Sequence, residues 1–255
     1  MEKTVYTVKS NRKIAKDVYE MKLLGSVRDF SAPGQFINIA IDGLYLRRPI
    51  SVCRIEKNGD DSANGLVTII YKVVGKGTEI MAGLAEGTEL SVLTALGNGF
   101  NTNPVKETAL VIGGGVGVPP MYGTAEKLLA EGKKVIAILG FNGSEDIFYE
   151  EEFKKLGAEV LVTTADGSYG IKGFVTDAMK KLQAEGTSFD YLFTCGPEPM
   201  LKAVYGASDV SGQYSFEQRM GCGFGACMGC SCKTKYGNKR ICKEGPVLVK
   251  EEIIW

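Results

Sequence analysis

Cysteine spacing near the C-terminus is the feature that most limits how this chain can fold. Five of the seven cysteines lie in one short stretch, and four of these form the pattern C-x4-C-x2-C-x11-C: Cys222, Cys227, Cys230 and Cys242. Three closely spaced thiolates with a fourth at a distance match the ligand pattern of plant-type [2Fe–2S] clusters. A loop that brings three sulfur atoms to one group must turn tightly, and the glycines between these cysteines permit such turns. The sequence therefore predicts that the four cysteines bind a two-iron cluster.

Two other interpretations of these cysteines stay open. A structural zinc site usually combines two C-x2-C pairs, whereas this stretch contains one, Cys227 and Cys230. The same pair would suit a thioredoxin-like redox motif, but it does not follow a βα junction as that motif does. Cys232 is left over; it could replace Cys230 as a ligand, although the two-residue spacing favours Cys230.

The absence of histidine excludes several kinds of chemistry. Ser-His-Asp and Cys-His catalysis, Rieske ligation, proximal-histidine haem and histidine-containing zinc sites all require it. The 30 basic and 30 acidic side chains balance, which argues against a nucleic-acid-binding surface. The N-terminus lacks the apolar stretch of a signal peptide, and no apolar run approaches the ~18 residues of a membrane span. We therefore expect a cytoplasmic protein that binds neither nucleic acid nor membrane.

Residues 1–102 show the short strands and frequent turns of a small antiparallel barrel. Apolar residues alternate along Ile37–Ile41, and turn residues such as Asn58-Gly59 separate the strands. The six expected strands are Thr4–Val8, Val18–Leu24, Gln35–Ile41, Pro49–Ile55, Leu66–Val74 and Glu89–Leu96.

Residues 103–210 change to continuous apolar strands separated by helical periods. Apolar residues recur at helical spacing in Met121–Leu129 and in Val175–Leu182. Strands that are apolar on both faces and alternate with amphipathic helices indicate a doubly wound parallel sheet. Residues 211–255 lose this periodicity, and we expect a third, small domain that folds around its metal group. The expected parallel strands are Ala109–Ile112, Val135–Leu139, Val160–Thr164 and Tyr191–Thr194.

A glycine run follows the first of these parallel strands and precedes a helix. Bare main-chain N–H groups at such a turn can hold an anion. The run does not form the G-x-G-x-x-G pattern, and tight packing of strand against helix is the alternative explanation. Cys195 ends the last parallel strand, where ligands of such sheets bind, although a single cysteine there more often serves buried packing than chemistry. The glycines of the run are Gly113, Gly114, Gly115 and Gly117.

The barrel half contains two further candidate phosphate contacts. Gly75 and Gly77 open a short helix for which Thr78 is the expected N-cap, and an ordinary capped turn is the alternative. Arg48 begins a strand, where its guanidinium can neutralise a phosphate, and Ser51 could reach the edge of a flavin ring. Many surface strands carry similar residues, so this segment is informative only in combination.

In combination, these segments resemble the ferredoxin–NADP reductase superfamily. The residues that carry the resemblance are Arg48-Pro49-Ile50-Ser51, Gly75-x-Gly77-Thr78, the 113–117 glycine run and Cys195-Gly196-Pro197. With the C-terminal cysteine pattern, the whole chain is similar to the electron-transfer subunits of class 1B dihydroorotate dehydrogenases. The resemblance implies an antiparallel FAD-binding β-barrel, a parallel-sheet NAD-binding domain and a small [2Fe–2S] domain. One departure is Thr94-Ala95, where this family leads us to expect Gly-Pro.

The resemblance also implies roles for the matching residues. Those implied to bind FAD are Arg48 at the pyrophosphate, Pro49, Ile50, Ser51 near the flavin N5, Ile70, Tyr71, Lys72, Gly77 and Thr78. Those implied to bound the NAD(H) site are Gly113, Gly114, Gly115, Gly117 and Cys195. Those implied to ligate the cluster are Cys222, Cys227, Cys230 and Cys242.

The implied function is electron transfer between NAD(H), FAD, the cluster and an FMN-containing catalytic subunit that acts on dihydroorotate, in a heterotetramer with two copies of each subunit. No general acid or base is expected in this chain. Asp166, in a segment without Arg or Lys, favours NAD over NADP. The alternatives are a related reductase subunit for ferredoxin or sulfur compounds, and a zinc-stabilised nucleotide-binding module. Trp255, the only tryptophan, is expected to pack the C-terminus rather than to assist docking.

Overall fold

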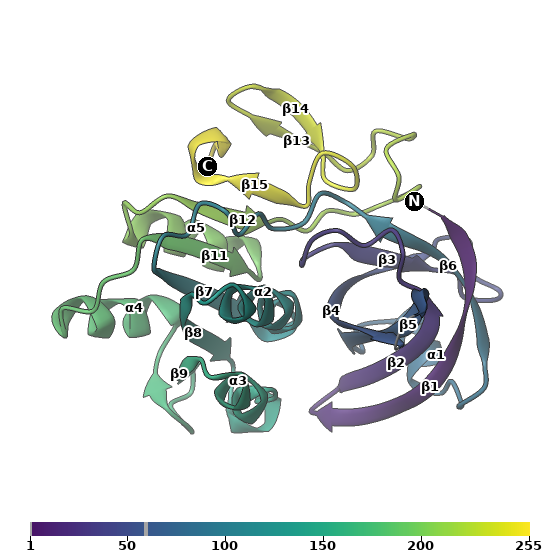
Figure 1. The fold of residues 1–255 in the computed structure, drawn as a ribbon, viewed down its shortest axis with the longest axis horizontal. Helices are drawn as coiled ribbons and strands as arrows, with labels where there is room; N and C mark the ends of the chain where they lie inside the picture. The colour runs from purple at the N-terminus through teal and green to yellow at the C-terminus, as the bar shows by residue number, and fades with distance from the viewer. Residues whose placement is uncertain (1, 59–60) are drawn as a thin grey trace.

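The computed structural model, which describes residues 2–58 and 61–255, contains a closed barrel and a helix-covered sheet that lie side by side (Figure 1). The C-terminal segment, drawn in yellow, lies across the top of the view above their junction. The expected turn at Asn58-Gly59 includes a residue that lies outside the described ranges.

Six antiparallel strands close the barrel in the order β1-β2-β5-β4-β3-β6. The predicted barrel is therefore confirmed, although single strands differ in length. β1 is longer than expected because it continues into a hairpin in which Ala15 pairs with Val18. The strands are β1 (Lys3–Ala15), β2 (Val18–Ser26), β3 (Phe36–Ile39), β4 (Arg48–Asn58), β5 (Asp61–Lys72) and β6 (Glu89–Leu96), with helix α1 (Lys76–Ala82) between the last two.

Successive residues of β5 face opposite sides of the barrel wall. Val67, Ile69 and Tyr71 are buried in the barrel interior. Ile70 points outward and is buried against the core of the neighbouring sheet domain. The barrel wall is thus apolar on both sides near the end of β5. The outward side of this wall packs against the sheet domain and so holds the two bodies together.

The end of β6 differs from the turn expected of the family. Ala95 has a φ of 51°, a value that the ring of proline cannot adopt. The pairing of β6 with β3 is irregular between Phe36 and Asn38. The main chain at Thr94-Ala95 therefore has a conformation that the expected Gly-Pro could not adopt.

The second body is a seven-stranded sheet with the order β10-β9-β8-β7-β11-β12-β15. The four predicted parallel strands are confirmed as β7 (Thr108–Gly114), β8 (Lys134–Phe141), β9 (Glu159–Thr164) and β11 (Tyr191–Cys195). The short strand β10 (Ile171–Lys172) extends one edge. Residues of α2 (Val118–Ala130) and α3 (Glu150–Leu156) share one hydrophobic cluster with the barrel. Residues of α4 (Val175–Ala184) and α5 (Glu198–Ala207) pack on the opposite face.

The C-terminal segment is less separate than the sequence suggested. β12 (Gly212–Ser215) pairs parallel to β11, and β15 (Val247–Val249) pairs antiparallel to β12, so both extend the sheet. Cys230 and Cys242 are buried in the same cluster as residues of β7. The segment therefore shares the core of the sheet instead of folding around a metal group alone. The domain boundary at residue 210 stays a prediction.

Hydrogen bonds across the junction hold the barrel against the sheet. Glu20 of β2, only 3% exposed, accepts a hydrogen bond from the hydroxyl of Tyr149 at 2.8 Å and one from Nε of Arg12 at 2.8 Å. The N–H of Lys16 donates to the carbonyl of Glu145 at 3.0 Å. Glu145 lies in the 3-10 helix η2 (Ser144–Asp146), beyond the carboxyl end of β8. These contacts fix the ligand-binding edge of the sheet next to the barrel.

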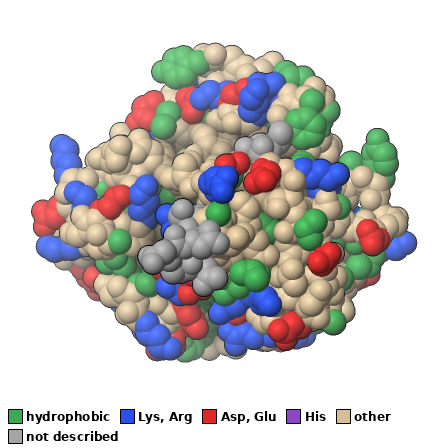
Figure 2. All heavy atoms as spheres, turned by 45° about the vertical axis from the view of Figure 1, so that its right-hand side comes forward, with side chains coloured by type: hydrophobic (Ala, Val, Ile, Leu, Met, Phe, Trp, Pro, Cys, Tyr) green, Lys and Arg blue, Asp and Glu red, His purple; other side chains and the backbone are tan. Residues whose placement is uncertain are grey.

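Acidic and basic side chains are interspersed over the face drawn in Figure 2. This distribution matches the zero formal charge of the chain. Among the described residues, no helix combines the length and the apolar character needed to cross a membrane.

Candidate functional site

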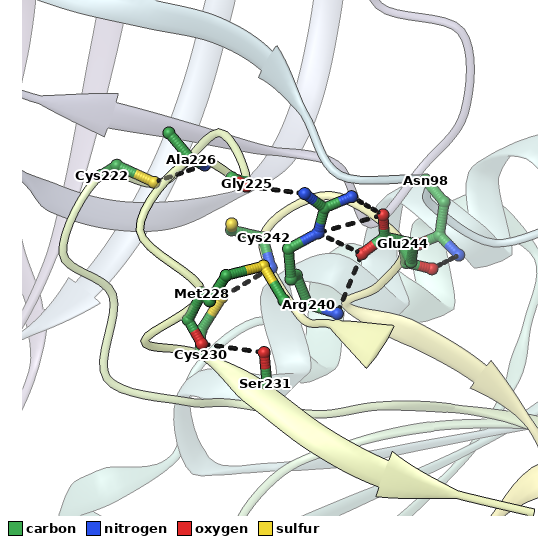
Figure 3. A network of polar contacts seen from close by, with 10 residues as sticks. All are labelled: Asn98, Cys222, Gly225, Ala226, Met228, Cys230, Ser231, Arg240, Cys242 and Glu244. Carbon is green, nitrogen blue, oxygen red and sulfur yellow. Dashed lines mark hydrogen bonds and ion pairs between the residues drawn. The ribbon is translucent and has the colours of Figure 1, made fainter. Parts of the chain in front are cut away.

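The cysteine loop, residues 222–230, lies along the chain between β12 and the hairpin of β13 (Ser231–Thr234) and β14 (Gly237–Arg240). Figure 3 shows Cys222 and Cys230 of this loop with Cys242 and the polar contacts around them. Main-chain N–H groups of Ala226 and Cys227 point at the sulfur of Cys222, at 3.2 and 3.4 Å. The N–H of Cys242 donates to the sulfur of Cys230 at 3.4 Å. Donors aimed at sulfur stabilise thiolates and tune the potential of iron–sulfur centres.

Two glycines give the loop its shape. Gly223 has a φ of 79° and Gly225 a φ of 92°, a region that other residues enter only with strain. A Cβ on Gly223 would also overlap the side-chain amide of Asn38 on β3. The predicted need for glycine in this loop therefore has a geometric cause.

The thiol pKa values differ within the loop. Burial acts to raise the pKa of Cys222, but main-chain N–H groups, that of Cys227 foremost, outweigh it and lower the pKa to about 6. Burial raises the pKa of Cys242 to about 12, together with the sulfur of Cys230 beside it. The main-chain N–H groups around Cys222 therefore favour its thiolate form, which is the form that ligates metals.

The four thiols fit a two-iron cluster by their chemistry. A structural zinc site gathers four ligands about one ion, whereas a [2Fe–2S] cluster is held by four thiolates spread over two irons. Cys232, the spare thiol, is half-buried on β13, where its near neighbours include Cys230, Glu252 and Lys239.

The cysteine loop rests on the barrel beside the predicted flavin segment. The amide of Asn38 on β3 approaches the carbonyl of Cys222 at 3.5 Å. Asn38 pairs with Pro49, and Phe36 pairs with Ser51 on β4. One strand therefore separates the loop from the segment that begins at Arg48.

Arg48 and Gly77 meet at the start of α1. A Cβ on Gly77 would lie 2.0 Å from Nε of Arg48, so the guanidinium rests directly against this glycine. The prediction that Thr78 is the N-cap is wrong, because Gly75 is the N-cap and Thr78 is the third helical residue. Its Oγ1 accepts the N–H groups of Val74 at 2.9 Å and Gly75 at 3.2 Å. The cation and the helix start lie together, as a pyrophosphate site requires.

The other residues predicted at the flavin differ in exposure. Pro49, Ile50 and Ser51 are half-buried on β4. At the end of β5, Ile70 and Tyr71 are buried at 3% and 2% exposure, and the hydroxyl of Tyr71 donates to Asn11 at 2.9 Å. The side chain of Tyr71 thus belongs to the barrel interior. Lys72 is half-exposed and reaches Asp146 of the sheet domain at 3.7 Å.

The glycine run combines packing with an open turn. Val118 and Met200 lie against Gly113 and Gly114 and leave no space for a Cβ. These two glycines therefore permit close packing, and their place at the NAD(H) site stays a prediction. Gly115 has a φ of 52° and no neighbour within 4 Å of an added Cβ, so it faces open space. A Cβ on Gly117 would overlap the carbonyl of Cys195. The turn and the end of β11 are therefore in direct contact.

The nucleotide edge of the sheet faces the end of the flavin strand. The 3-10 helix η1 (Gly115–Gly117) contacts β5. Part of Cys195 reaches the surface, but its thiol is buried, and this burial raises the pKa of the thiol to about 12, although a hydrogen bond to Ser215 acts in the other direction. A protonated thiol beside a phosphate-binding turn suits packing against a ligand better than nucleophilic chemistry.

Several residues of the site escaped sequence analysis. Asn38, Asn98 and Arg240 contact the cysteine loop or the segment that carries Cys242. Asn38 is separated from Cys222 by 184 positions, so no local pattern links them. Arg240 lies two residues from Cys242, and that proximity was the one available signal.

Two protein-family models match the chain. One is described as the iron-sulfur cluster binding domain of dihydroorotate dehydrogenase B and matches residues 217–254. The other is described as an oxidoreductase NAD-binding domain and matches residues 111–205. The first includes all four cysteines of the pattern, and the second includes the glycine run and Cys195.

Full-length relatives agree with these matches. The chain is 48% identical to the dihydroorotate dehydrogenase B (NAD(+)), electron transfer subunit, of Fusobacterium nucleatum subsp. nucleatum, over 97% of this chain and 96% of that protein. It is 43% identical to the protein of the same name from Bacillus velezensis, over 99% of each.

A solved structure shares the architecture. It belongs to a study of flavin-based electron bifurcation by an NADH-dependent reduced ferredoxin-NADP oxidoreductase, and it superposes with a TM-score of 0.87 at 31% identity, covering 99% of this chain and 90% of that chain. This protein is thus an oxidoreductase subunit with an NAD-binding and an iron–sulfur-binding domain, and it belongs to the family of dihydroorotate dehydrogenase B electron-transfer subunits.

Proposed function

We propose that this chain passes electrons between NAD(H) and an FMN-containing dihydroorotate dehydrogenase catalytic subunit, through FAD on the barrel and a [2Fe–2S] cluster in the cysteine loop. Oxidation of dihydroorotate to orotate releases two electrons and two protons. In pyrimidine biosynthesis these electrons would therefore enter this chain from the catalytic subunit. NAD⁺ would take up both electrons and one proton to become NADH, and the second proton would go into solution. Bound FAD would supply the chemistry that converts between the hydride of NAD(H) and the single electrons that a cluster can carry. The chain itself supplies no acid or base for dihydroorotate.

The order of the three sites carries this proposal. η1, at the carboxyl edge of the sheet, contacts β5. β5 pairs with β4, and β4 pairs with β3, on which Asn38 meets the loop at Cys222. Nucleotide turn, flavin segments and cysteine loop are thus successive neighbours, which is what a relay of electrons needs.

In this proposal, each group of residues would hold one part of a cofactor. Arg48, against Gly77, would hold the FAD pyrophosphate, while Pro49, Ile50 and Ser51 would line the flavin. The main chain of residues 70–72 would form the second flavin edge, since the side chain of Tyr71 fills the barrel. Gly115, Gly117 and Cys195 would bound the nicotinamide nucleotide. The cluster ligands would be Cys222, Cys227, Cys230 and Cys242.

The membership in this family implies a catalytic partner. We extend the proposal to a heterotetramer with two copies of each subunit, with FMN in the partner. We also propose a cytoplasmic setting, in which the seven free cysteines stay reduced, and three domains at residues 1–102, 103–210 and 211–255.

The decisive measurement is the visible spectrum of anaerobically purified protein before and after NADH addition, with iron and flavin quantified. We expect flavin bands over a broad iron–sulfur absorbance, both bleached by NADH. A colourless, zinc-loaded protein that NADH leaves unchanged would refute the proposal and support a nucleotide-binding module. The variant Cys222→Ser should lose the cluster signal and keep FAD. Cys53→Ala is the matched control, because Cys53 is buried at the barrel junction and should keep both signals.

Nucleotide preference tests the nucleotide site separately. Asp166 follows β9, and a Cβ on Gly143, beyond the end of β8, would meet its carboxylate at 2.6 Å. That carboxylate would repel the 2′-phosphate of NADP and can accept a ribose hydroxyl. We expect a higher kcat/KM with NADH than with NADPH, and a reduced difference in Asp166→Asn. A clear preference of the unaltered protein for NADPH would refute this assignment.

Similarity to the ferredoxin-linked oxidoreductase supports a second candidate, a reductase subunit for ferredoxin or a related acceptor. The higher full-length identity to the dihydroorotate dehydrogenase subunits favours the first. Mixing the chain with a dihydroorotate dehydrogenase catalytic subunit distinguishes them. NAD⁺ reduction that depends on dihydroorotate supports the first, and ferredoxin reduction without such coupling supports the second.

A further inference from the structure

Arg240 joins the two parts of the cysteine set (Figure 3). Its Nη1 donates to the carbonyl of Gly225 at 2.7 Å, in the middle of the loop that carries three of the cysteines. Arg240 itself ends β14, two residues before Cys242. One guanidinium therefore ties the loop to the segment that carries the fourth cysteine.

Glu244 fixes the orientation of this guanidinium. Nε of Arg240 donates to Oε2 of Glu244 at 2.8 Å, and Nη2 bonds the other carboxylate oxygen. The main-chain N–H of Arg240 donates to the same carboxylate at 2.9 Å. The two side chains are 24% and 35% exposed. A paired contact of this kind holds the plane of an arginine, and lysine cannot reproduce it.

Asn98 anchors the same segment to the end of the barrel. Its Nδ2 donates to the carbonyls of Glu244 at 3.1 Å and Val247 at 2.7 Å. Its main-chain N–H donates to the carbonyl of Gly245 at 2.7 Å. Asn98 lies just after β6. A continuous set of contacts thus runs from the barrel to the crest of the cysteine loop.

The guanidinium also places a positive charge near the ligands. It lies close enough to Cys242 and Cys230 for the charges to interact. Reduction adds an electron to a cluster, and a nearby cation stabilises the added negative charge. Removal of the cation should therefore lower the reduction potential, and removal of the neighbouring carboxylate should raise it.

We propose that Arg240 is a positioning residue of the iron–sulfur centre: it holds the cysteine loop in its ligating conformation and raises the reduction potential of the cluster, while Glu244 orients it and partly offsets its charge. The inference rests on the proposed cluster and its four ligands. It goes further because it assigns roles at the cluster to Arg240 and Glu244, which are not among the proposed ligands.

The test uses the full chain, purified anaerobically with FAD and cluster, at low ionic strength. The variants are Arg240→Gln, Arg240→Lys and Glu244→Gln, with Lys180→Gln on α4 as control, since Lys180 is 72% exposed and far from the loop in sequence. Spectroelectrochemistry with electron paramagnetic resonance gives the cluster potential. Loss of cluster absorbance to an iron chelator gives the stability of the loop.

We expect a more negative potential in Arg240→Gln, a more positive one in Glu244→Gln, and a value near the unaltered protein in Arg240→Lys. Chelator should remove the cluster several-fold faster from both Arg240 variants, because each loses the bond to Gly225. The control should match the unaltered protein in both measurements. Shifts of the same sign in Arg240→Gln and Glu244→Gln, or no shift in either, would refute the electrostatic role.

Failure of the proposed function would look different. In that case the unaltered protein itself would lack iron and the cluster spectrum. If Arg240→Gln does not fold, a more positive potential in Glu244→Gln, with an unchanged potential in Arg240→Lys, still tests the sign of the effect. Unchanged chelator rates in Arg240→Lys would refute the positioning role alone.

Discussion

Tyr149→Phe should loosen the junction between barrel and sheet. The hydroxyl of Tyr149 donates at 2.8 Å to Glu20, whose side chain is only 3% exposed. A hydrogen bond to a charged group contributes about 1.5–3 kcal/mol, because its loss leaves a buried charge short of a donor. Phenylalanine keeps the ring contact with Tyr122, at 5.0 Å between centroids, and the same backbone φ of 68°. The substitution therefore isolates the hydroxyl.

We expect the free energy of unfolding to fall by about 1.5–3 kcal/mol in this variant. Urea unfolding followed by fluorescence of Trp255 reports on the sheet, where this tryptophan packs against Phe216 and Tyr205. Far-ultraviolet circular dichroism reports on both bodies, and coincident transitions show that they unfold together.

Tyr169→Phe is the matched control. Its hydroxyl also donates to a glutamate, Glu150, at 3.2 Å, but the tyrosine is 45% exposed. An exposed contact of this kind should change stability by no more than about 0.5 kcal/mol. A double-mutant cycle of Tyr149→Phe with Glu20→Gln should give a coupling above about 1 kcal/mol. A loss below about 0.5 kcal/mol in Tyr149→Phe would refute the view that this bond joins the two bodies.

Three further predictions concern single positions. Gly117→Ala should weaken NADH binding and destabilise the sheet by about 1–3 kcal/mol, because its Cβ would overlap the carbonyl of Cys195; unchanged NADH titration and urea midpoint would contradict the close contact. Burial raises the pKa of Tyr71 well above its usual value. The buried, protonated Tyr71 therefore contributes its full stabilisation below about pH 10, and this stabilisation falls as pH rises further. Urea midpoints measured between pH 9 and 11 should decline less steeply in Tyr71→Phe than in the unaltered protein. Arg240 lowers the pKa of Glu244 to about 2 from 4.5, so the stabilisation from this pair is present above pH 4.5 and is lost as pH falls toward 2; an acid-unfolding profile that Glu244→Gln leaves unaltered would argue against it.

Local patterns predicted much of the fold because each depends on neighbouring residues. Alternation in Ile37–Ile41 requires only that one face of a strand be buried, and the continuous run Ala109–Ile112 requires burial on both faces. Both segments form strands, β3 and β7, although β3 ends at Ile39 and its polar residue Asn38 is buried as well. Thr78 was misassigned because capping depends on where the helix begins, and the structure starts it at Lys76 after an extended Gly75.

The C-terminal segment shows where local patterns fail. β12 has four residues and β15 has three, too few for periodicity to distinguish them from a loop. They become strands because β11 offers a free edge whose main-chain groups need partners. Only the assembled sheet supplies that edge, so the shared core could not be predicted from residues 211–255.

The sequence by itself determined the kinds of residue available for chemistry and the order of barrel, sheet and cysteine loop along the chain. Four spaced thiols, a glycine run after a strand and the absence of histidine are properties of the chain. Tertiary structure alone decided which of these meet. Asn38 reaches the loop at Cys222, Arg48 lies on Gly77, and Arg240 spans the cysteine set. Such contacts depend on how strands pair and bodies pack, and these are set by burial summed over the whole chain rather than by any one segment.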